Sequence, residues 1–249
     1  MAQARLITIG ISHYCEKARW FMDRAGFSYQ EEAHGPILHK FATTGAGGSS
    51  TPMLVDGSVV LKDSTDILKY LEEKTGVGLY PADATLREEA EKEEDFFDEK
   101  FGPHTRRLGY HLLLPHRKFL VSYLQKGLPS WEANLLPWIF PMGEILMRRL
   151  MNITDESSER SRGRVNQVFD DVAKRLADGR HFLTGDTFTV VDLTFASLAA
   201  PMVMPTEYGW PWPTLEELPD NVAEVVRHYR NTPAGEFVLR LYREERNKR

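Results

Sequence analysis

The stretch that decides the fold is RLITIGISHYCEKARWFMDRAG, residues 5–26. Residues 6–11 form an apolar run that predicts a strand, and Ser12–Cys15 predicts a turn. A helix follows, because apolar residues recur at the i, i+3, i+4 and i+7 spacing of one buried face: Ala18, Phe21, Met22 and Ala25. Gly26 stands where a helix commonly ends in the left-handed conformation.

This strand, turn and helix place a hydroxyl and a thiol at a helix N-terminus, from Ser12 and Cys15. The first N–H groups of a helix have no partner within it, and the positive end of the helix dipole lies there. Such a position favours an anion. We expect that anion to be a thiolate.

Composition narrows the classes of function. The hydrophobic fraction of 42% and charged fraction of 27% are typical of a core-forming protein. The net charge of -5 argues against a nucleic-acid binder, because no dense basic face is present to neutralise phosphates. Only the C-terminal tail is locally basic (Arg243, Arg246, Lys248 and Arg249), and we interpret it as a solvated, frayed helix end.

Cys15 is the single cysteine, so the sequence predicts no intramolecular disulfide and no cysteine-rich metal site. The eight histidines show no pairing at metal-ligand spacing, and we expect no metal. No apolar run approaches the ~20 residues that span a bilayer, and the N-terminus lacks the apolar stretch of a signal peptide. We therefore expect a cytoplasmic protein that binds neither membrane nor nucleic acid.

The pattern after Gly26 predicts a compact α/β unit. Residues 28–32 could form a second strand parallel to the first, and residues 33–50 read as a long polar, mobile loop at the edge of a site. Two β-rich runs divided by Asp56-Gly57 predict a hairpin, with Pro52 at a strand start. The polar cluster at residues 63–66 predicts the N-terminus of a helix that ends near Lys74.

From residue 84 onward, helical patterns dominate. Helices are expected at 85–101, 116–126 and 134–152, along a long segment around Val165–Leu176, and at 193–204. Gly102-Pro103 must interrupt or kink the first helix, because proline removes a donor and crowds the preceding turn. Thr189 and Asp192 precede the last, apolar helix as a capping box.

Three features together resemble the cytosolic glutathione transferase superfamily. They are Ser12-x-x-Cys15-x-Lys17-Ala18-Arg19, the step Thr51-Pro52 followed by Asp63-Ser64, and Phe182-Leu183-x-Gly185-Asp186-x-x-Thr189-x-x-Asp192. The resemblance implies a thioredoxin-like glutathione-binding domain at 1–78, followed by an all-helical domain at 84–249 that carries the electrophile pocket. The helical part is longer than usual for the family, and the excess around 110–160 could roof a pocket or form a subunit contact.

The resemblance also implies roles for residues around glutathione. A cis proline at Pro52 would present the backbone of Thr51 to the cysteinyl part of the peptide. Asp63 and Ser64 would meet its γ-glutamyl end, although the family more often has Glu or Gln where Asp63 stands. Lys40 could pair with the glycine carboxylate.

Three side chains are candidates for the residue that activates the glutathione sulfur or reacts with it. Ser12 matches the activating serine of the serine-type classes, and its hydroxyl would stabilise a thiolate by donating a hydrogen bond. Tyr14 could supply that hydroxyl instead, as tyrosine does in other classes. Cys15 could form a mixed disulfide, or could be an inert buried thiol. We expect His13 to be exposed on the turn.

The electrophile pocket is expected around the kink after the linker, with five candidates: Phe101, His104, Leu108, Tyr110 and His111. The implied activity is transfer of glutathione to a small hydrophobic electrophile by a homodimer. The alternatives are a glutathione-dependent thiol reductase that uses Cys15 and a scaffold that kept the fold without the chemistry.

Overall fold

The computed structural model describes residues 3–248. Its N-terminal part has the order βαβαββα: β1 (Ala4–Thr8), α1 (His13–Arg24), β2 (Tyr29–Ala33), α2 (His39–Gly45), β3 (Met53–Asp56), β4 (Val59–Leu61) and α3 (Ser64–Thr75). Nine further helical elements follow: α4 (Ala84–Lys100), α5 (Gly102–Leu113), the 3-10 helix η1 (Leu114–His116), α6 (Arg117–Leu124), α7 (Ser130–Leu150), α8 (Asp155–Leu176), α9 (Val190–Val203), α10 (Asp220–Arg230) and α11 (Pro233–Glu245). This confirms a thioredoxin-like domain followed by an all-helical one.

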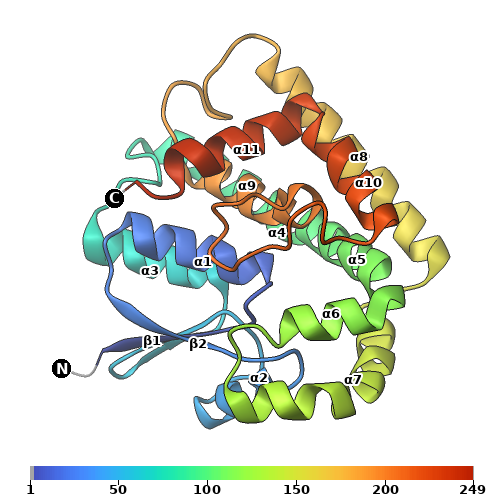
Figure 1. Ribbon diagram of the computed structural model, residues 1–249. Helices are drawn as coiled ribbons and strands as arrows, with labels where there is room; N and C mark the ends of the chain where they lie inside the picture. The colour runs from blue at the N-terminus through green and yellow to red at the C-terminus, as the bar shows by residue number, and fades with distance from the viewer. Residues whose placement is uncertain (1–2, 249) are drawn as a thin grey trace.

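The four strands form one mixed sheet in the order β2-β1-β3-β4. β1 pairs with β2 in parallel and with β3 antiparallel, and β3 and β4 form an antiparallel hairpin. α1 and α3 cover one face of the sheet and α2 lies beneath the other (Figure 1). The sheet thus holds the carboxyl end of β1 and the start of α1 between α2 and the helical domain.

The stretch at 5–26 folds as its pattern predicts. Leu6 and Ile7 are fully buried in β1, and α1 ends before Gly26, which has a φ of 61°. The first turn of α3 is capped by the Asp63 side chain, which accepts a hydrogen bond from the backbone N–H of Thr65. The predicted parallel strand and the α3 boundaries are therefore confirmed to within one or two residues.

Two local predictions in this part are wrong. Residues 33–50 are not one loop, because they contain α2, whose N-terminal neighbour Leu38 is buried. Its Thr and Gly residues are weak helix formers, so tertiary packing fixes the helix and the sequence pattern does not reveal it. The hairpin turn consists of Gly57 and Ser58, one residue later than expected, with Gly57 at a φ of 62°.

The helical part is confirmed in outline. α4 ends at Lys100 and α5 begins at Gly102, so the helix breaks where Gly102-Pro103 predicts. α7 starts earlier than expected and continues through two prolines, Pro137 and Pro141. None of the helices within residues 3–248 combines the length and the apolar character needed to cross a membrane.

α9 is the central helix of the molecule and is buried almost along its whole length. α1 and α4 both pack on it, so one hydrophobic core joins the sheet side to the helical side. The limits 1–78 and 84–249 stay a prediction, because this continuous core gives no packing boundary between them.

Asp192 closes the N-terminus of α9, as the capping box predicts. Its carboxylate accepts hydrogen bonds from the backbone N–H groups of Leu183, at 2.7 Å, and Thr189, at 3.0 Å. Both bonds are buried, so removing the carboxylate leaves two donors without a partner.

We expect Asp192→Ala to lower the free energy of unfolding by about 2–4 kcal/mol, because a helix cap and two buried hydrogen bonds are lost together. Urea denaturation followed by circular dichroism measures this change. Asp186→Ala is the matched control, because Asp186 is exposed in the same loop. Equal stability of the two variants would contradict the role given to Asp192.

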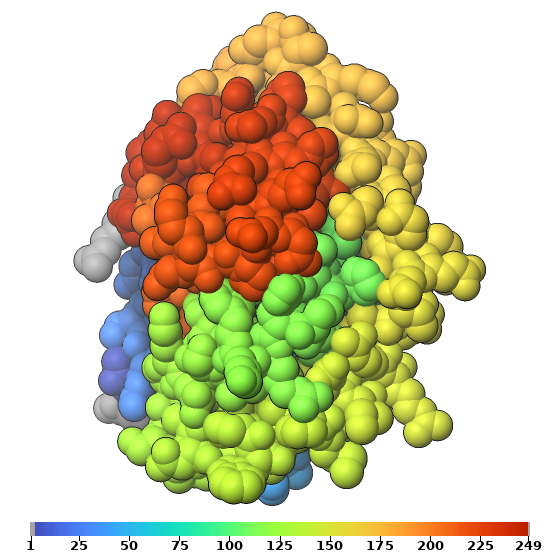
Figure 2. Space-filling view, turned by 45° about the vertical axis from the view of Figure 1, so that its right-hand side comes forward, coloured from blue at the N-terminus to red at the C-terminus, as the bar shows by residue number. Residues whose placement is uncertain are grey.

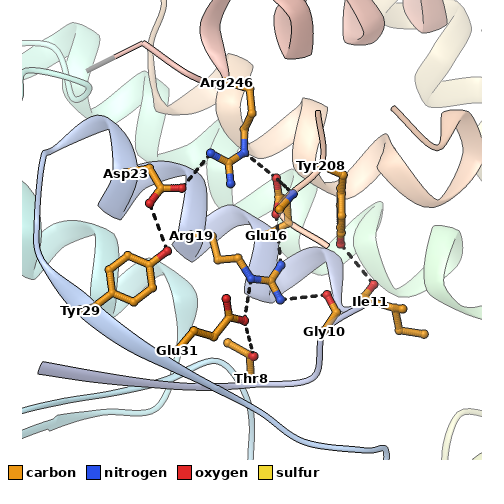
Figure 3. A network of polar contacts seen from close by, with 11 residues as sticks. Thr8, Gly10, Ile11, Glu16, Arg19, Asp23, Tyr29, Glu31, Tyr208 and Arg246 are labelled. Carbon is orange, nitrogen blue, oxygen red and sulfur yellow. Dashed lines mark hydrogen bonds and ion pairs between the residues drawn. The ribbon is translucent and has the colours of Figure 1, made fainter. Parts of the chain in front are cut away.

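The C-terminal tail differs from its prediction at one residue. Arg246 is buried, and its guanidinium donates to Glu16 at 2.7 Å and to Asp23 at 2.8 Å (Figure 3). Arg243 and Lys248 are exposed as expected, and Arg249 lies outside the described residues. The end of α11 is thus bonded to α1 and is no frayed terminus.

Candidate functional site

A cavity of about 250 Å³ opens at the N-terminus of α1. Its wall combines the end of β1 and the start of α1 with the segment before β3, one face of α5, the end of α9 and the loop after it. The lining residues are Ile9, Ile11, Ser12, His13, Tyr14, His39, Ser50, Thr51, Arg106, Gly109, Tyr110, Leu113, Met151, Pro201, Met204 and Trp212. The cavity therefore lies between the thioredoxin-like and helical parts.

Ser12 is the N-cap residue of α1 and borders this cavity. Its backbone N–H donates to the carbonyl of Ile9, and its carbonyl accepts from the N–H of Glu16, each at 2.9 Å. The side chain makes no capping hydrogen bond. The hydroxyl hydrogen-bonds to the Cys15 thiol. Rotation away from this weak acceptor would let it donate to a group bound in the cavity, beside the first N–H groups of the helix.

The turn that carries Ser12 is fixed from below by a buried polar network (Figure 3). The guanidinium of Arg19 donates to the carbonyl of Gly10 at 2.8 Å, and the hydroxyl of Tyr208 donates to the carbonyl of Ile11 at 3.2 Å. These contacts satisfy two carbonyls of the turn and hold its backbone in one geometry. A rigid turn fixes the position of the hydroxyl relative to the cavity.

Arg19 itself is held by two carboxylates, Glu31 at 2.8 Å and Glu16 at 3.1 Å. Its side chain is almost completely buried. Burial alone would lower the pKa of Arg19, but the charges of Glu31 and Glu16 outweigh it and the pKa is raised. The guanidinium thus stays charged beneath the turn.

Tyr14 borders the cavity, but its hydroxyl is already engaged. It donates to the backbone carbonyl of Asp98 at 2.7 Å. Burial raises the pKa of the phenol, and the nearby Arg106 charge offsets this only in part. Tyr14 therefore lines the cavity, and its hydroxyl hydrogen is already donated to a backbone carbonyl and not to a bound sulfur.

Cys15 is fully buried and does not border the cavity. Burial raises the pKa of its thiol, and the Arg19 charge and the neighbouring Ser12 hydroxyl offset this only in part. Thiolate formation and access to a substrate are both disfavoured at this position.

The exposed position expected for His13 is wrong, because the ring is 2% exposed. Its Nε2 bonds to the carbonyl of Gly102 at 2.9 Å. Burial lowers the pKa of His13 to about 3, so the ring is neutral at pH 7 and Nε2–H is the donor. His13 therefore fastens α1 to the start of α5.

Of the residues predicted to hold glutathione, Thr51 borders the cavity and the others do not. The Thr51–Pro52 peptide bond is cis, Thr51 borders the cavity, and Pro52 is buried behind it. Ser64 is the first residue of α3 and is 3% exposed, whereas Asp63 is exposed and caps the helix. The structure thus brings Ser12 and Thr51 together at the cavity, whereas Asp63 and Ser64 at the start of α3 do not line it.

A buried charge cluster supports the start of α3. The ammonium of Lys17 lies 2.8 Å from Glu94 and also pairs with Asp98, while the hydroxyl of Thr65 lies within hydrogen-bond distance of both carboxylates. Burial alone would lower the pKa of Lys17, but Glu94 and Asp98 outweigh it and raise the pKa. Lys17 of the first motif therefore joins α1 to α3 and α4.

Lys40 is exposed on α2 and does not border the cavity, whereas its neighbour His39 does. Burial and the Lys40 charge lower the pKa of His39, so its ring is neutral at pH 7. The loop before α2 is tied to α7 by Glu132, which bonds to Nδ1 of His34 at 2.5 Å and to the N–H of Gly35 at 2.8 Å.

Of the five residues predicted for the electrophile pocket, Tyr110 borders the cavity and the other four do not. Phe101 and Leu108 are fully buried in the main core. His104 bonds to the hydroxyl of Ser161 at 3.0 Å, and His111 lies 3.9 Å from Asp155. These four placements are corrections to the predicted pocket.

The cavity face of α5 carries a different set with helical spacing: Arg106, Gly109, Tyr110 and Leu113. The sequence analysis also missed four residues from distant segments: Met151, Pro201, Met204 and Trp212. The i, i+3, i+4, i+7 spacing of the α5 set could have been found in the sequence. Nothing in the local pattern marks that face as the one toward the cavity.

Two family models match the chain. The one described as the N-terminal domain of glutathione S-transferase matches residues 6–78, and the one described as its C-terminal domain matches residues 155–228. The chain belongs to the glutathione S-transferase superfamily. No curated protein is similar enough in sequence to give a match.

Solved structures of this superfamily share the fold. Glutathione transferase F2 of Populus trichocarpa has a TM-score of 0.57 and 16% identity, with 96% of this chain and 99% of that chain covered. A theta class enzyme from Xanthomonas axonopodis pv. citri, solved with glutathione bound, has a TM-score of 0.54, 17% identity and coverages of 96% and 98%. A glutathione S-transferase of Sinorhizobium meliloti has a TM-score of 0.58, 19% identity and coverages of 96% and 93%.

These identities establish a common fold only. The activity of this superfamily member has to be inferred from its own site. No three His, Cys, Asp or Glu side chains within residues 3–248 come close enough to hold a metal ion. A larger surface hollow, of about 640 Å³, is lined by Asp23, Phe27 and Lys248 among others, but it borders none of the predicted site residues. The cavity at Ser12 is therefore the candidate site.

Proposed function

We propose that this protein is a serine-type glutathione transferase, in which the Ser12 hydroxyl donates a hydrogen bond to the glutathione thiolate. The observation that supports this best is the position of Ser12. Its hydroxyl makes no capping bond, borders a cavity, and stands at the N-terminus of α1 on a turn fixed by Arg19 and Tyr208.

In this proposal, glutathione binds along the sheet side of the cavity. Its cysteinyl part pairs with the backbone of Thr51, and its γ-glutamyl carboxylate lies at the N-terminus of α3, beside Ser64. Asp63 accepts a hydrogen bond from the amino group of the γ-glutamyl part. Its Oδ1 caps α3 by accepting from Thr65, and Oδ2 can accept from the ligand. The glycine end would reach α2, where His39 borders the cavity and Lys40, outside it, would pair with the carboxylate.

The chemistry follows from this position. A free thiol has a pKa near ~8.5, and a hydroxyl donor with the helix N-terminus would bring it to about 6–7, so the thiolate becomes the resting form. The sulfur then forms a bond to the electrophilic carbon of a substrate held against the apolar wall. Catalysis comes from stabilising the thiolate and from proximity of the two reactants.

The reductase alternative has little structural support. It needs an accessible thiolate at Cys15, and that thiol is fully buried with a raised pKa. The scaffold alternative predicts a cavity that no longer binds glutathione. A role in detoxification and a cytoplasmic location accompany the transferase proposal as predictions.

Binding and conjugation test the proposal directly. We expect the protein to be retained on immobilised glutathione, to show thiolate absorbance in the ultraviolet when glutathione binds, and to accelerate conjugation of 1-chloro-2,4-dinitrobenzene. Replacement of Cys15 by Ser should leave conjugation intact. Absence of binding at millimolar glutathione would favour the scaffold instead.

We further propose that the protein is a homodimer that associates through α7. One face of this helix exposes seven large apolar side chains: Trp131, Leu135, Trp138, Met142, Ile145, Leu146 and Leu150. A standard interface buries about 800 Å² on each partner, and a continuous row of exposed apolar side chains along one helix is the kind of surface that it covers. Figure 2 shows that residues around 130–150 form the lower edge of the molecule below the C-terminal helices.

The double variant Trp138→Asp/Met142→Asp should therefore be monomeric, since Trp138 is 83% and Met142 73% exposed and neither change disturbs the core. Light scattering after size exclusion measures the mass. The matched variant Leu86→Asp/Phe96→Asp carries the same substitutions on exposed apolar residues of α4. A monomer produced by that variant alone would assign the contact to α4 and contradict the α7 interface.

A further inference from the structure

Among the described residues, Arg106 is the one arginine that lines the cavity, and no carboxylate pairs with it. It lies on α5 beside Tyr110, and within residues 3–248 no carboxylate comes within ion-pair distance of it. Its Nε is buried and makes no hydrogen bond. The buried guanidinium groups of Arg19 and Arg246, by contrast, are each paired with two carboxylates.

The surroundings of Arg106 leave its Nε–H without an acceptor. The guanidinium lies 5.9 Å from the centre of the Tyr14 ring, and a ring face offers no lone pair to an N–H. The neighbouring wall is mostly apolar, with Leu113, Pro201 and Met204 among its residues. A partly buried cation without a partner is unfavourable, so a ligand that brings an anion to this wall is stabilised there.

The position of Arg106 separates it from the glutathione carboxylates. The proposed places for those carboxylates are the start of α3 and α2, both on the thioredoxin-like side. Arg106 belongs to the helical side, on the same face of α5 as Gly109 and Leu113. Its planar fork of donors matches a carboxylate in a bidentate geometry.

We propose that Arg106 selects the electrophile, and that the preferred substrates are hydrophobic electrophiles that carry a carboxylate. The inference rests on the proposed transferase function and names its substrate class. With an aryl chloride, the glutathione sulfur forms a bond to the ring carbon, the carbon–chlorine bond breaks, and chloride leaves with the bonding pair. The carboxylate takes no part in the bond changes and stays paired with Arg106.

Two matched electrophiles test this proposal: 4-chloro-3,5-dinitrobenzoate and its neutral amide. The measured quantity is the ratio of their kcat/KM values at saturating glutathione, each corrected for the uncatalysed reaction. We expect the wild type to favour the benzoate. Arg106→Gln should lower that ratio at least tenfold, because a charge-assisted hydrogen bond to the carboxylate is lost. Arg106→Lys should lower it less.

Arg107→Gln is the control for removal of a positive charge from α5. Arg107 donates to the carbonyl of Met151 and to Ser161 and does not border the cavity, so the ratio should keep its wild-type value. If Arg106→Gln slows both electrophiles equally, or raises only the KM for glutathione, Arg106 serves the thiolate or the peptide and the proposal is overturned.

The experiment distinguishes failure of the proposed transferase function from failure of the role proposed for Arg106. Wild-type protein that conjugates neither electrophile contradicts the transferase function itself. Wild-type protein that conjugates both, with no preference for the benzoate, leaves the transferase function standing and overturns the role of Arg106.

Discussion

Ser12→Ala lowers kcat/KM for glutathione conjugation at pH 7 by about 15- to 30-fold, because the thiolate fraction falls when the pKa of the bound thiol returns from about 6–7 to ~8.5. The hydroxyl borders the cavity and makes no capping bond, so its removal should leave the helix cap unchanged. The main effect should fall on the thiolate.

The pKa of bound glutathione gives a more direct readout of the same change. Loss of the donor destabilises the charged form, so the pKa of the bound thiol should rise toward its free value of ~8.5. At pH 7 the thiolate fraction then falls, and the conjugation rate should recover as the pH is raised. Titration of the thiolate absorbance in wild type and variant measures this shift.

Ser12→Thr is the matched variant, since it keeps a hydroxyl at the same position. We expect it to retain most of the low pKa, whereas Ser12→Ala does not. If both variants bind glutathione as a thiolate with the wild-type pKa, then the helix N-terminus alone activates the sulfur. That result would remove the serine from the proposed mechanism.

Arg19→Leu should lower the free energy of unfolding by about 3–5 kcal/mol, because it leaves charges buried without their partner. Arg19 is bonded to Glu16, Glu31 and the carbonyl of Gly10, and all three bonds disappear together (Figure 3). Denaturation in guanidinium chloride measures the loss. The turn before Ser12 should also lose its fixed geometry, so conjugation should slow in the protein that remains folded.

Arg5→Leu provides the comparison. Arg5 makes an ion pair with Glu32 at 2.6 Å, but its side chain is 45% exposed, and such surface pairs contribute about 0–1 kcal/mol. Similar stability losses in the two variants would mean that the buried network adds nothing beyond an ordinary surface pair. The structural support assigned to Arg19 would then be wrong.

The elements that the sequence predicted are those whose signals are local. The strand and helix of residues 5–26, the Gly57 hairpin and the capping box of Asp192 each follow from the residues that form them. Periodicity and turn chemistry act within a few residues, so no knowledge of the rest of the chain is needed. α2 was missed because packing against the sheet, and no local pattern, fixes it.

The site could be predicted only where a motif marks it. Ser12 and Thr51 stand in the quoted motifs, Tyr14 lies within the first of them, and all three border the cavity, while their roles stay a prediction. The helix α5 was not among the predicted helices; its Leu108, like Phe101 just before it, faces the core, while Arg106 and Leu113 face the cavity. A periodic pattern shows that a helix has faces, but it does not show which neighbour each face meets.

Charged residues were the hardest to place. Arg246 was expected in solvent, yet it bonds to Glu16, 230 residues away along the chain. Lys17 and Arg19 were quoted for the family pattern, but their buried partners come from β2 and α4. Ion pairs of this kind depend on contacts between distant segments, and these contacts cannot be deduced from the pattern of a single sequence.

The bond of Glu132 to His34 and Gly35 joins the helix proposed for self-association to the loop that precedes α2. Displacing α7 must therefore displace the segment placed at the glycine end of glutathione. Self-association and peptide affinity then become linked equilibria, and thermodynamic reciprocity requires each to change the other by the same factor. If dilution to the monomer lowers the affinity for glutathione, added glutathione must shift the equilibrium toward the dimer.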